Sequence, residues 1–249
     1  MKAAVLLSGG MGLRMGADIP KQYIRVSGKM LITYCLETLL AHPMIDAVQI
    51  VAEEEWRKVI LDDVKENGLN AEKICGFSKP GTERQSSVFH ALADLKGRMG
   101  DVFCGLAGEN PERLASGAVL IHDAVRPNLS KEQVTDCFKA LKKHDGVMPV
   151  LPMKDTVYLS EDGGRVSKLL DREKVFAGQA PEAFLFDKYY AANLRLMPDG
   201  ICRIKGSTEP AVLAGMDVAM IPGDENNFKI TTKADLKYFR KQKETGGCV

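Results

Sequence analysis

Short runs of apolar residues alternate along this chain with longer segments in which apolar residues recur at helical spacing. Short runs bounded by glycine or polar residues are typical of buried parallel strands, and the longer segments are typical of amphipathic helices. The pattern predicts strands over 3–7, 47–52, 74–76, 118–122, 146–150 and 217–221. It predicts helices over 31–41, 54–67, 84–95, 131–143, 185–197 and 233–243.

Some of the predicted helix boundaries have an evident chemical cause. Pro43 disfavours helical backbone at the residue before it, which ends the helix over 31–41. Ser130 and Thr232 each precede a helical segment and are predicted N-caps, because their hydroxyls can accept an unpaired backbone N–H. Gln133 stands in the capping-box position relative to Ser130.

The alternation of strands and helices predicts an α/β fold, a single domain over 1–249 whose mostly parallel sheet is flanked by helices. The rhythm breaks where two strand-like segments, 156–159 and 165–169, flank Glu161-Asp162-Gly163-Gly164. An Asp-Gly turn between such segments indicates a β-hairpin. We therefore expect a protruding β-hairpin arm at about 154–172, used in dimerisation.

Two further segments lack strand or helix periodicity. The segment 97–117 is rich in glycine, proline and charge, and is predicted to be a long surface connection with a short helical piece at 111–114. The last residues, 246–249, are expected to be frayed.

Composition limits the classes of partner and compartment. The chain has 249 residues, 45% apolar and 27% charged, as in a soluble globular protein with a full core. A net charge of +1 gives no reason to expect nucleic acid or an anionic membrane as partner. No apolar run is long enough to span a bilayer, and Met1-Lys2 leads into a strand without a cleavage site, so the sequence predicts a cytoplasmic protein.

The cysteines add no metal or disulfide framework. Six are scattered along the chain without a C-x-x-C pair, which fits neither a zinc ligand set nor paired bridges. We expect reduced thiols that mostly fill the core.

The candidate chemistry begins where the first strand stops, at Ser8-Gly9-Gly10. A glycine-rich turn after a buried strand exposes backbone N–H groups that can cradle a polyphosphate. Gly12 continues the loop, and Arg14 and Lys21 place two cations on it. The stretch therefore predicts a nucleoside triphosphate site.

Two common phosphate loops do not match this spacing. A Walker A loop requires a second glycine five positions after the first, with a Lys directly after it. The chain has Arg14 five positions after Gly9 and Met15 five positions after Gly10, so it does not match. The dinucleotide fingerprint places a third glycine where the chain has Met15, and Pro20 interrupts the helix that this fingerprint expects. An NAD(P)-binding oxidoreductase is thus a disfavoured alternative.

The strand followed by S-G-G-x-G-x-R-M-G and P-K-Q-Y resembles the signature of sugar- and alditol-phosphate cytidylyltransferases. The nearest resemblance is to the 2-C-methyl-D-erythritol 4-phosphate cytidylyltransferase family, with the ribitol-5-phosphate cytidylyltransferases as close relatives. Further matching motifs follow in the family's order along nearly the whole chain, at 80–88, 120–127, 154–157, 179–184 and 227–232.

The resemblance implies that the α/β domain is a single Rossmann-like nucleotidyltransferase domain. It also implies attack of an alditol-phosphate oxygen on the α-phosphorus of CTP, with release of pyrophosphate. It assigns catalysis to Arg14, Lys21 and Lys229, which would hold the phosphates. It also implies Mg²⁺, bound mainly through the CTP phosphates, and no protein metal ligand is predicted.

The resemblance also assigns the two substrate pockets. The nucleotide would contact Ser8, Gly9, Gly10, Gly12, Gly81, Thr82, Ser87, Asp123 and Ala124. The acceptor would contact Asp123, Arg126, Thr156, Arg172 and Thr208, with Thr156 and Arg172 coming from the arm of a neighbouring subunit. An alternative for Asp123 and Arg126 is a pair that braces the turn before Pro127.

The sequence leaves the acceptor open. Ala180 and Glu182 stand where the family usually has Thr and Gln, and Glu209 stands where it usually has Asp. The predicted function is transfer of CMP from CTP to 2-C-methyl-D-erythritol 4-phosphate, in isoprenoid precursor biosynthesis, by a homodimer. The alternatives are a ribitol-5-phosphate cytidylyltransferase, a non-catalytic nucleotide-binding protein and the oxidoreductase.

Overall fold

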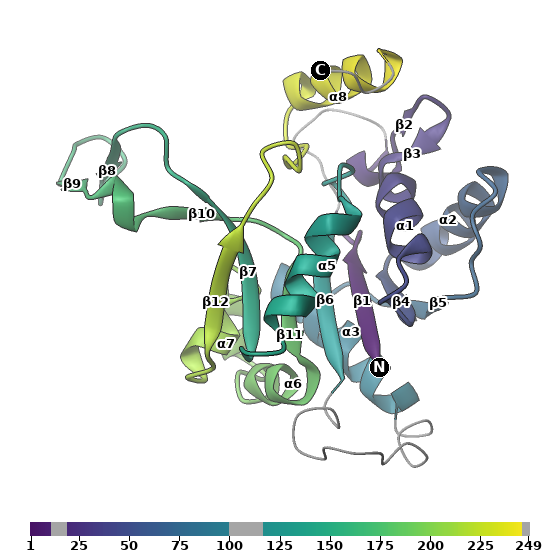
Figure 1. Ribbon diagram of the computed structural model, residues 1–249, viewed down its shortest axis with the longest axis horizontal. Helices are drawn as coiled ribbons and strands as arrows, with labels where there is room; N and C mark the ends of the chain where they lie inside the picture. Colours follow the sequence, from purple (N-terminus) through teal and green to yellow (C-terminus); the bar gives the residue numbers. More distant parts are fainter. Residues whose placement is uncertain (11–18, 100–116, 246–249) are drawn as a thin grey trace.

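A computed structural model describes residues 1–10, 19–99 and 117–245 of the chain. Its centre is a mixed sheet with helices on both faces, shown in Figure 1. Arg14, Gly12 and the predicted helical piece at 111–114 lie outside the described residues.

Four parallel strands form the half of the sheet that carries the first glycine turn. They are β1 (Lys2–Leu7), β4 (Ala47–Val51), β5 (Ile74–Ser78) and β6 (Ala118–Asp123), in the order β6-β1-β4-β5. Both faces of β1 are covered, because Ala4 and Leu6 belong to one core cluster and Ala3 and Val5 to another. This burial on both faces explains the uninterrupted apolar run in the sequence.

The other half of the sheet is mixed. β7 (Gly146–Pro152) pairs in parallel with β12 (Val218–Pro222) and antiparallel with β10 (Phe176–Gly178) and β11 (Glu182–Leu185). β11 also pairs antiparallel with β6 and so joins the two halves. The sequence pattern did not predict β10 and β11, since strands this short depend on long-range pairing and not on a local pattern.

Helices cover both faces of the sheet. α1 (Leu31–Ala41), α2 (Glu54–Glu66) and α5 (Lys131–Ala140) pack on one face, and α3 (Arg84–Met99), α6 (Phe186–Leu194) and α7 (Glu209–Leu213) on the other. α8 (Lys233–Glu244) forms a separate cluster with the small hairpin of β2 (Arg25–Val26) and β3 (Lys29–Met30). α7, β2 and β3 were not predicted.

The predicted boundaries differ from the observed ones at several helix ends. α5 ends at Ala140 and α6 spans only Phe186–Leu194, whereas α3 continues to Met99. Residues 97–99 are therefore helical and not part of the predicted connection. The predicted N-caps are confirmed: the Ser130 hydroxyl accepts from the N–H of Gln133, and Thr232 forms a capping box with Asp235.

The predicted hairpin is confirmed and projects from the main body (Figure 1). β8 (Val157–Leu159) and β9 (Lys168–Leu170) pair antiparallel, and a 3-10 turn, η4 (Arg172–Lys174), follows them. The tip is closed by Asp162, whose carboxylate accepts the N–H groups of Gly164 and Arg165. Gly163 adopts a φ of 74°, which explains the glycine at the turn.

Among the helices of the described ranges, none is both long and apolar enough to cross a membrane.

Candidate active site

A cleft of about 750 Å³ opens at the edge of the sheet where the parallel strands β1, β4, β5 and β6 have their carboxyl ends. After β5 the chain crosses to the other side of β1 to form β6, so the strand order reverses beside β1. Ligands of open α/β sheets bind at this kind of reversal. The cleft is lined by Leu7, Ser8, Gly9, Gly10, Lys21, Gln22, Glu53, Pro80, Gly81, Thr82, Glu83, Arg84, Ser87, Asp123, Val125, Lys229 and Thr231.

The glycine turn after β1 is fixed by a short 3-10 helix, η2 (Lys21–Tyr23). The Gln22 amide donates to the carbonyl oxygens of Ser8 and Gly10, at 2.5 and 2.8 Å, and the Tyr23 hydroxyl donates to Ser8 O at 2.9 Å. In a trans peptide the N–H points opposite to the C=O. The N–H of Gly9 therefore points away from Gln22, in a position to meet an anion.

A second glycine turn closes the opposite wall of the cleft. A Cβ at Gly9 would lie 2.4 Å from the Pro80 ring, so the two turns approach too closely for a larger residue. The Gly81 N–H donates to the Ser87 hydroxyl at 2.9 Å, which ties this turn to the first turns of α3. The close contact explains the glycine at position 9, beyond any need for backbone freedom.

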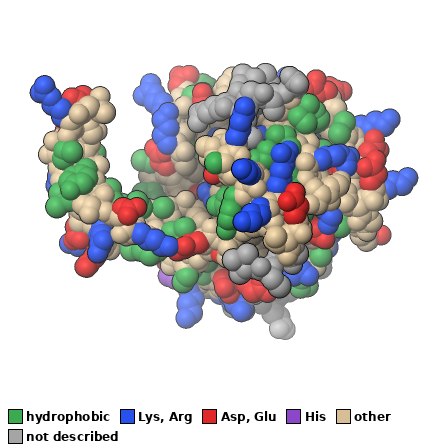
Figure 2. All heavy atoms as spheres, turned by 90° about the horizontal axis from the view of Figure 1, so that it is seen from above, with side chains coloured by type: hydrophobic (Ala, Val, Ile, Leu, Met, Phe, Trp, Pro, Cys, Tyr) green, Lys and Arg blue, Asp and Glu red, His purple; other side chains and the backbone are tan. Residues whose placement is uncertain are grey.

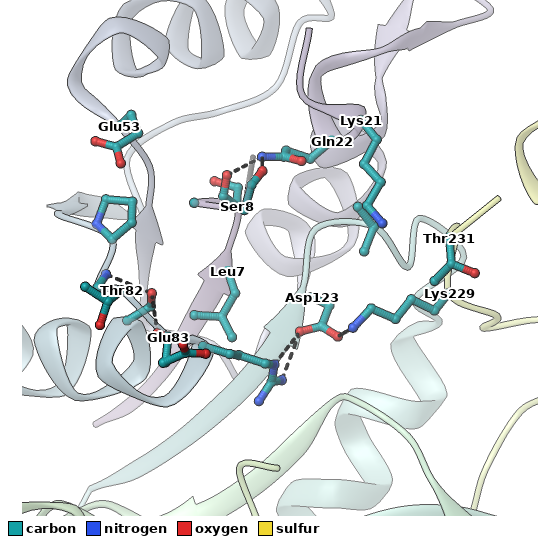
Figure 3. Close-up of a pocket in the computed structure, with 17 residues that line it drawn as sticks. Leu7, Ser8, Lys21, Gln22, Glu53, Thr82, Glu83, Asp123, Lys229 and Thr231 are labelled. Atoms are coloured by element: carbon teal, nitrogen blue, oxygen red, sulfur yellow. Dashed lines mark hydrogen bonds and ion pairs between the residues drawn. The ribbon is translucent and has the colours of Figure 1, made fainter. Parts of the chain in front are cut away.

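Asp123, the last residue of β6, is held between two cations. Arg84 donates to its Oδ1 from Nε at 3.2 Å and from Nη2 at 2.9 Å, and Lys229 Nζ lies 2.9 Å from its Oδ2. Figure 3 shows the Asp123 carboxylate and the Lys229 side chain pointing toward each other. Both oxygens are occupied, so Asp123 is an anchor for the two side chains.

The charges around Asp123 fix its protonation state. Burial alone would raise its pKa, but Arg84 and Lys229 outweigh burial and hold the pKa well below its usual range. Asp123 is therefore ionised over the whole physiological range. A carboxylate with such a low pKa and no free oxygen is a poor general base.

Two lysines lie on one side of the cleft. Lys21 and Lys229 extend from the same side in Figure 3, facing Thr82 and Glu53 on the other. Figure 2, which looks onto the carboxyl edge of the sheet, shows Lys and Arg side chains clustered over this part of the surface. A nearly neutral chain thus concentrates positive charge locally, as a polyphosphate site requires.

Most of the predicted nucleotide-binding residues line the cleft, and Ala124 lies behind the cleft wall. Ser8, Gly9, Gly10, Lys21, Gly81, Thr82, Ser87, Asp123 and Lys229 all line the cleft. Ala124 does not line it: its side chain is buried in the core, and its N–H donates to Leu7 O.

Arg126 also lies behind the cleft wall. Its Nη1 donates to Asn227 O at 2.7 Å, and its Nε lies 4.0 Å from Asp123 Oδ2. These contacts tie the turn after β6 to the segment that carries Lys229. They favour the bracing role that the sequence left open.

The predicted acceptor residues on the arm lie outside the cleft of their own chain. Arg172 Nη1 donates to Lys154 O within the arm, and Thr156 is an exposed arm residue. Thr208, at the start of α7, donates to Glu182 Oε1 at 3.1 Å. None of the three lines the cleft.

Sequence reasoning missed two residues that shape the site. Arg84 was placed within a recognised motif but received no role, although a cation at the start of a helix next to a predicted binding turn was the available signal. Gln22 lies in the P-K-Q-Y motif, yet nothing local indicated that its buried amide would hold the glycine turn.

The described carboxylates offer no ready metal centre. No cluster of three or more His, Cys, Asp or Glu suited to a metal occurs in the described ranges. Asp123 has both oxygens engaged by cations, and Glu53 and Glu83 are the other carboxylates of the lining.

Comparison with known proteins decides the family. The family model of IspD, 2-C-methyl-D-erythritol 4-phosphate cytidylyltransferase, matches residues 2–240. The chain belongs to this family. It is 32% identical over 240 residues to the 2-C-methyl-D-erythritol 4-phosphate cytidylyltransferase of Thermotoga neapolitana, covering 96% of both chains.

Other relatives are longer, bifunctional enzymes. The chain is 35% identical over 239 residues to a bifunctional enzyme IspD/IspF of Granulibacter bethesdensis, covering 94% of this chain but 54% of that protein. It therefore spans about half the length of the bifunctional relatives.

Solved structures agree on the fold. The 4-diphosphocytidyl-2C-methyl-D-erythritol synthase of Anaerococcus prevotii superposes with a TM-score of 0.75 at 24% identity, over 98% of this chain and 96% of that one. IspD of Francisella tularensis gives 0.73 at 22% identity, over 97% and 99%. The predicted nucleotidyltransferase fold, family and enzyme class are confirmed, and the oxidoreductase alternative falls.

Proposed function

We propose that this protein transfers the cytidylyl group of CTP to 2-C-methyl-D-erythritol 4-phosphate and releases pyrophosphate, in isoprenoid precursor biosynthesis. Family membership over nearly the whole chain supports the reaction class. The observation that carries the proposal is the cleft itself, where two glycine turns face Lys21 and the Asp123–Lys229 pair at the strand reversal.

The proposed reaction needs positioning and charge stabilisation more than proton transfer. A phosphate oxygen of the acceptor attacks the α-phosphorus, a new P–O bond forms, and the bond to the bridging oxygen of pyrophosphate breaks. The attacking oxygen is already ionised, so no general base is required. Lys21, Arg14 and Lys229 would stabilise the negative charge that spreads over the non-bridging oxygens and the leaving group.

Mg²⁺ belongs to this proposal. It would be held mainly by the phosphates of CTP and would neutralise charge that the side chains leave uncompensated. The cations of the cleft would then act on the α-phosphate and the acceptor.

We further propose that the site is completed by the arm of a second subunit. Thr156 and Arg172 lie on an arm that projects away from the cleft of its own chain (Figure 1), so a contact with the acceptor requires a neighbouring molecule. The arm exposes Tyr158, Val166 and Leu169, each more than half exposed. Apolar side chains gathered on one arm are typical of an interface.

A reducing compartment suits the cysteines. Cys35, Cys75, Cys137 and Cys202 are free thiols, and Cys35 and Cys137 are buried. This supports the proposed cytoplasmic location.

The identity of the acceptor is the least constrained part of the proposed function. A panel of acceptor substrates tests it. Pyrophosphate release would be followed with CTP and Mg²⁺ plus methylerythritol phosphate, ribitol 5-phosphate or erythritol phosphate. We expect the highest kcat/KM with methylerythritol phosphate. Preference for ribitol 5-phosphate would move the protein to the alternative function, and no release with any acceptor would contradict the proposal.

A further inference from the structure

Glu182 lies next to the site but does not line the cleft. It begins β11, opposite Ile121 of β6 in the antiparallel ladder, close to Asp123 at the end of that strand. Residues paired in this way project to the same face of the sheet. Ile121 belongs to the core cluster under α3, α6 and α7, so the Glu182 side chain enters that layer at its upper edge.

The carboxyl group of Glu182 is buried and only half satisfied. Glu182 is 8% exposed, and its Oε1 accepts the Thr208 hydroxyl at 3.1 Å. Its Oε2 has no hydrogen-bond partner in the part of the chain that the structure describes. A buried carboxylate with an unpaired oxygen is costly, so such a group either carries a proton or draws a nearby donor towards it.

The nearest cation to the unpaired oxygen is Arg84, which already holds Asp123. Arg84 Nη2 is 2.9 Å from Asp123 Oδ1 and 3.8 Å from Glu182 Oε2. Its Nη1 donates to the Ser207 hydroxyl. Arg84 therefore lies between two carboxylates, and Lys229 holds the far oxygen of one of them.

These contacts form a row of alternating charge from Glu182 through Arg84 and Asp123 to Lys229. We propose that Glu182 is a positioning residue whose protonation state sets how firmly Asp123 holds Lys229, and hence how well the cleft binds the triphosphate. When Glu182 is neutral, Arg84 pairs with Asp123 alone. Asp123 then holds Lys229 less firmly, and Lys229 can contact phosphate more readily. When Glu182 is ionised, it competes with Asp123 for Arg84, so Asp123 pairs more strongly with Lys229. The net charge of the cluster is then less positive.

The groups around Glu182 favour its protonated form. Burial raises the pKa of Glu182, Arg84 opposes it, Asp123 adds to it, and the hydroxyls of Ser207 and Thr208 lower it, with a net increase. The other titratable or charged groups facing it are Arg126 after β6, Tyr189 on α6 and Cys137 on α5. Burial raises the pKa of both Tyr189 and Cys137, so neither ionises in the range where Glu182 does.

This inference rests on the proposed function, since it requires that the cleft bind CTP. It makes a prediction about binding alone. An anion that enters near Glu182 favours its neutral form, so CTP binding should be accompanied by proton uptake, and binding should weaken as Glu182 ionises.

The test measures CTP–Mg²⁺ binding by titration calorimetry between pH 5 and pH 9, in buffers of different ionisation enthalpy. The proteins are wild type, Glu182→Gln and a matched control, Glu209→Gln, which changes a carboxylate on the neighbouring helix α7. We expect the ratio of the wild-type Kd to the Glu182→Gln Kd to rise with pH by up to about tenfold per pH unit. Proton uptake should be seen in wild type and the control and be lost in Glu182→Gln.

Ionisation of the CTP phosphates affects all three proteins equally and cancels in the ratio. A ratio that stays flat with pH, or equal proton uptake in wild type and Glu182→Gln, would overturn the inference while CTP binding itself stands. Absence of CTP binding by wild type would instead overturn the proposed function, and this inference with it. If Glu182→Gln does not fold, Thr208→Val provides the second variant: loss of its hydroxyl should move the proton uptake to higher pH, and an unmoved profile would contradict the proposal.

Discussion

Asp123 shows how one residue can organise a candidate active site through its contacts with two cations. It stands at the end of β6, where the sheet edge presents it to the cleft, and it joins α3 to the segment after β12 through Arg84 and Lys229. Because its charge is fully used in holding two cations, its contribution is geometric. In the proposed reaction, the phosphates would meet the cations that Asp123 positions.

Substitution of the cleft lysines should affect turnover more than folding. Lys21→Ala and Lys229→Ala each remove a cation that faces the transferring phosphate in the proposed mechanism. Loss of one preorganised donor costs about 3 kcal/mol, or a factor of about 10² to 10³ in kcat. Steady-state kinetics of pyrophosphate release measures this. Lys139→Ala, on the surface of α5, is the control and should retain the wild-type rate. Near-normal turnover of both cleft variants would exclude the mechanism.

His122 should make the protein sensitive to acid. It is fully buried beside Asp123, and burial lowers its pKa from 6.5 to about 4. Between these two values the unfolded chain binds more protons than the folded one, so the free energy of unfolding falls as the pH drops from about 6.5 to 4, by about 3 kcal/mol.

Urea unfolding of wild type and His122→Asn across this window measures the contribution. The loss of stability on acidification should be smaller in His122→Asn by about that amount, while other carboxylates contribute equally to both proteins. His90→Asn, which changes a partly exposed histidine on α3, should behave as wild type. Identical acid sensitivity of wild type and His122→Asn would contradict the assignment.

At the scale of elements, the site is built where two glycine turns meet. The turn after β1 is held from one side by η2, whose Tyr23 stacks on Trp56 of α2 at 4.2 Å between ring centroids. The turn before α3 is held by Ser87. Each turn is therefore fixed by the helix that follows it in the sequence, and the two are brought together by the parallel pairing of β1 with β4 and of β4 with β5.

Gly81 should be intolerant of even a methyl group. A Cβ there would lie 2.4 Å from Ser86 Cβ and 2.9 Å from Ser87 N, which forces the turn away from α3. Gly81→Ala should lower the free energy of unfolding by about 1–3 kcal/mol through overpacking, and should weaken CTP binding. Gly97→Ala provides the matched control in α3, because a Cβ there meets nothing within 4 Å.

The control variant Gly97→Ala should itself change the free energy of unfolding in a known direction. Alanine is favoured over glycine inside a helix by about 0.8–1 kcal/mol, so Gly97→Ala should be neutral or stabilising. Urea unfolding and CTP titration compare the two variants. Equal stability and equal affinity in Gly81→Ala and Gly97→Ala would show that the turn does not require close approach.

At the scale of the whole molecule, the arm separates two parts of one proposed site. Lys21 lies in the cleft of the main body, whereas Arg172 lies on the projecting arm (Figure 1). If the site is shared between subunits, a dimer of one Lys21→Ala chain and one Arg172→Ala chain contains one intact site, although neither homodimer does.

Co-expression of the two variants tests this arrangement. Random pairing should restore about a quarter of the wild-type rate, because half of the dimers are mixed and each of these has one of two sites intact. Co-expression of Lys21→Ala with Lys229→Ala, both in the cleft, should restore nothing. A site formed within one chain would leave the first mixture as inactive as its components.

The sequence by itself determined what depends on local spacing. The apolar runs fixed the parallel strands β1, β4 and β6, the hydroxyls of Ser130 and Thr232 fixed two helix starts, and Asp162-Gly163 fixed the tip of the arm. The ordered motifs were enough to identify the family. These signals lie within a few residues of one another, so the chain carries them without its fold.

Only the tertiary structure decided how distant residues combine. β10 and β11 form because their backbones pair with β6 and β7. No local sequence pattern predicts this pairing. Arg84 acquires a role only when α3 is placed beside the end of β6, and Glu182 only when β11 brings a carboxyl beneath the same guanidinium. Long-range pairing and burial set these distances, and the charge of each group follows from them.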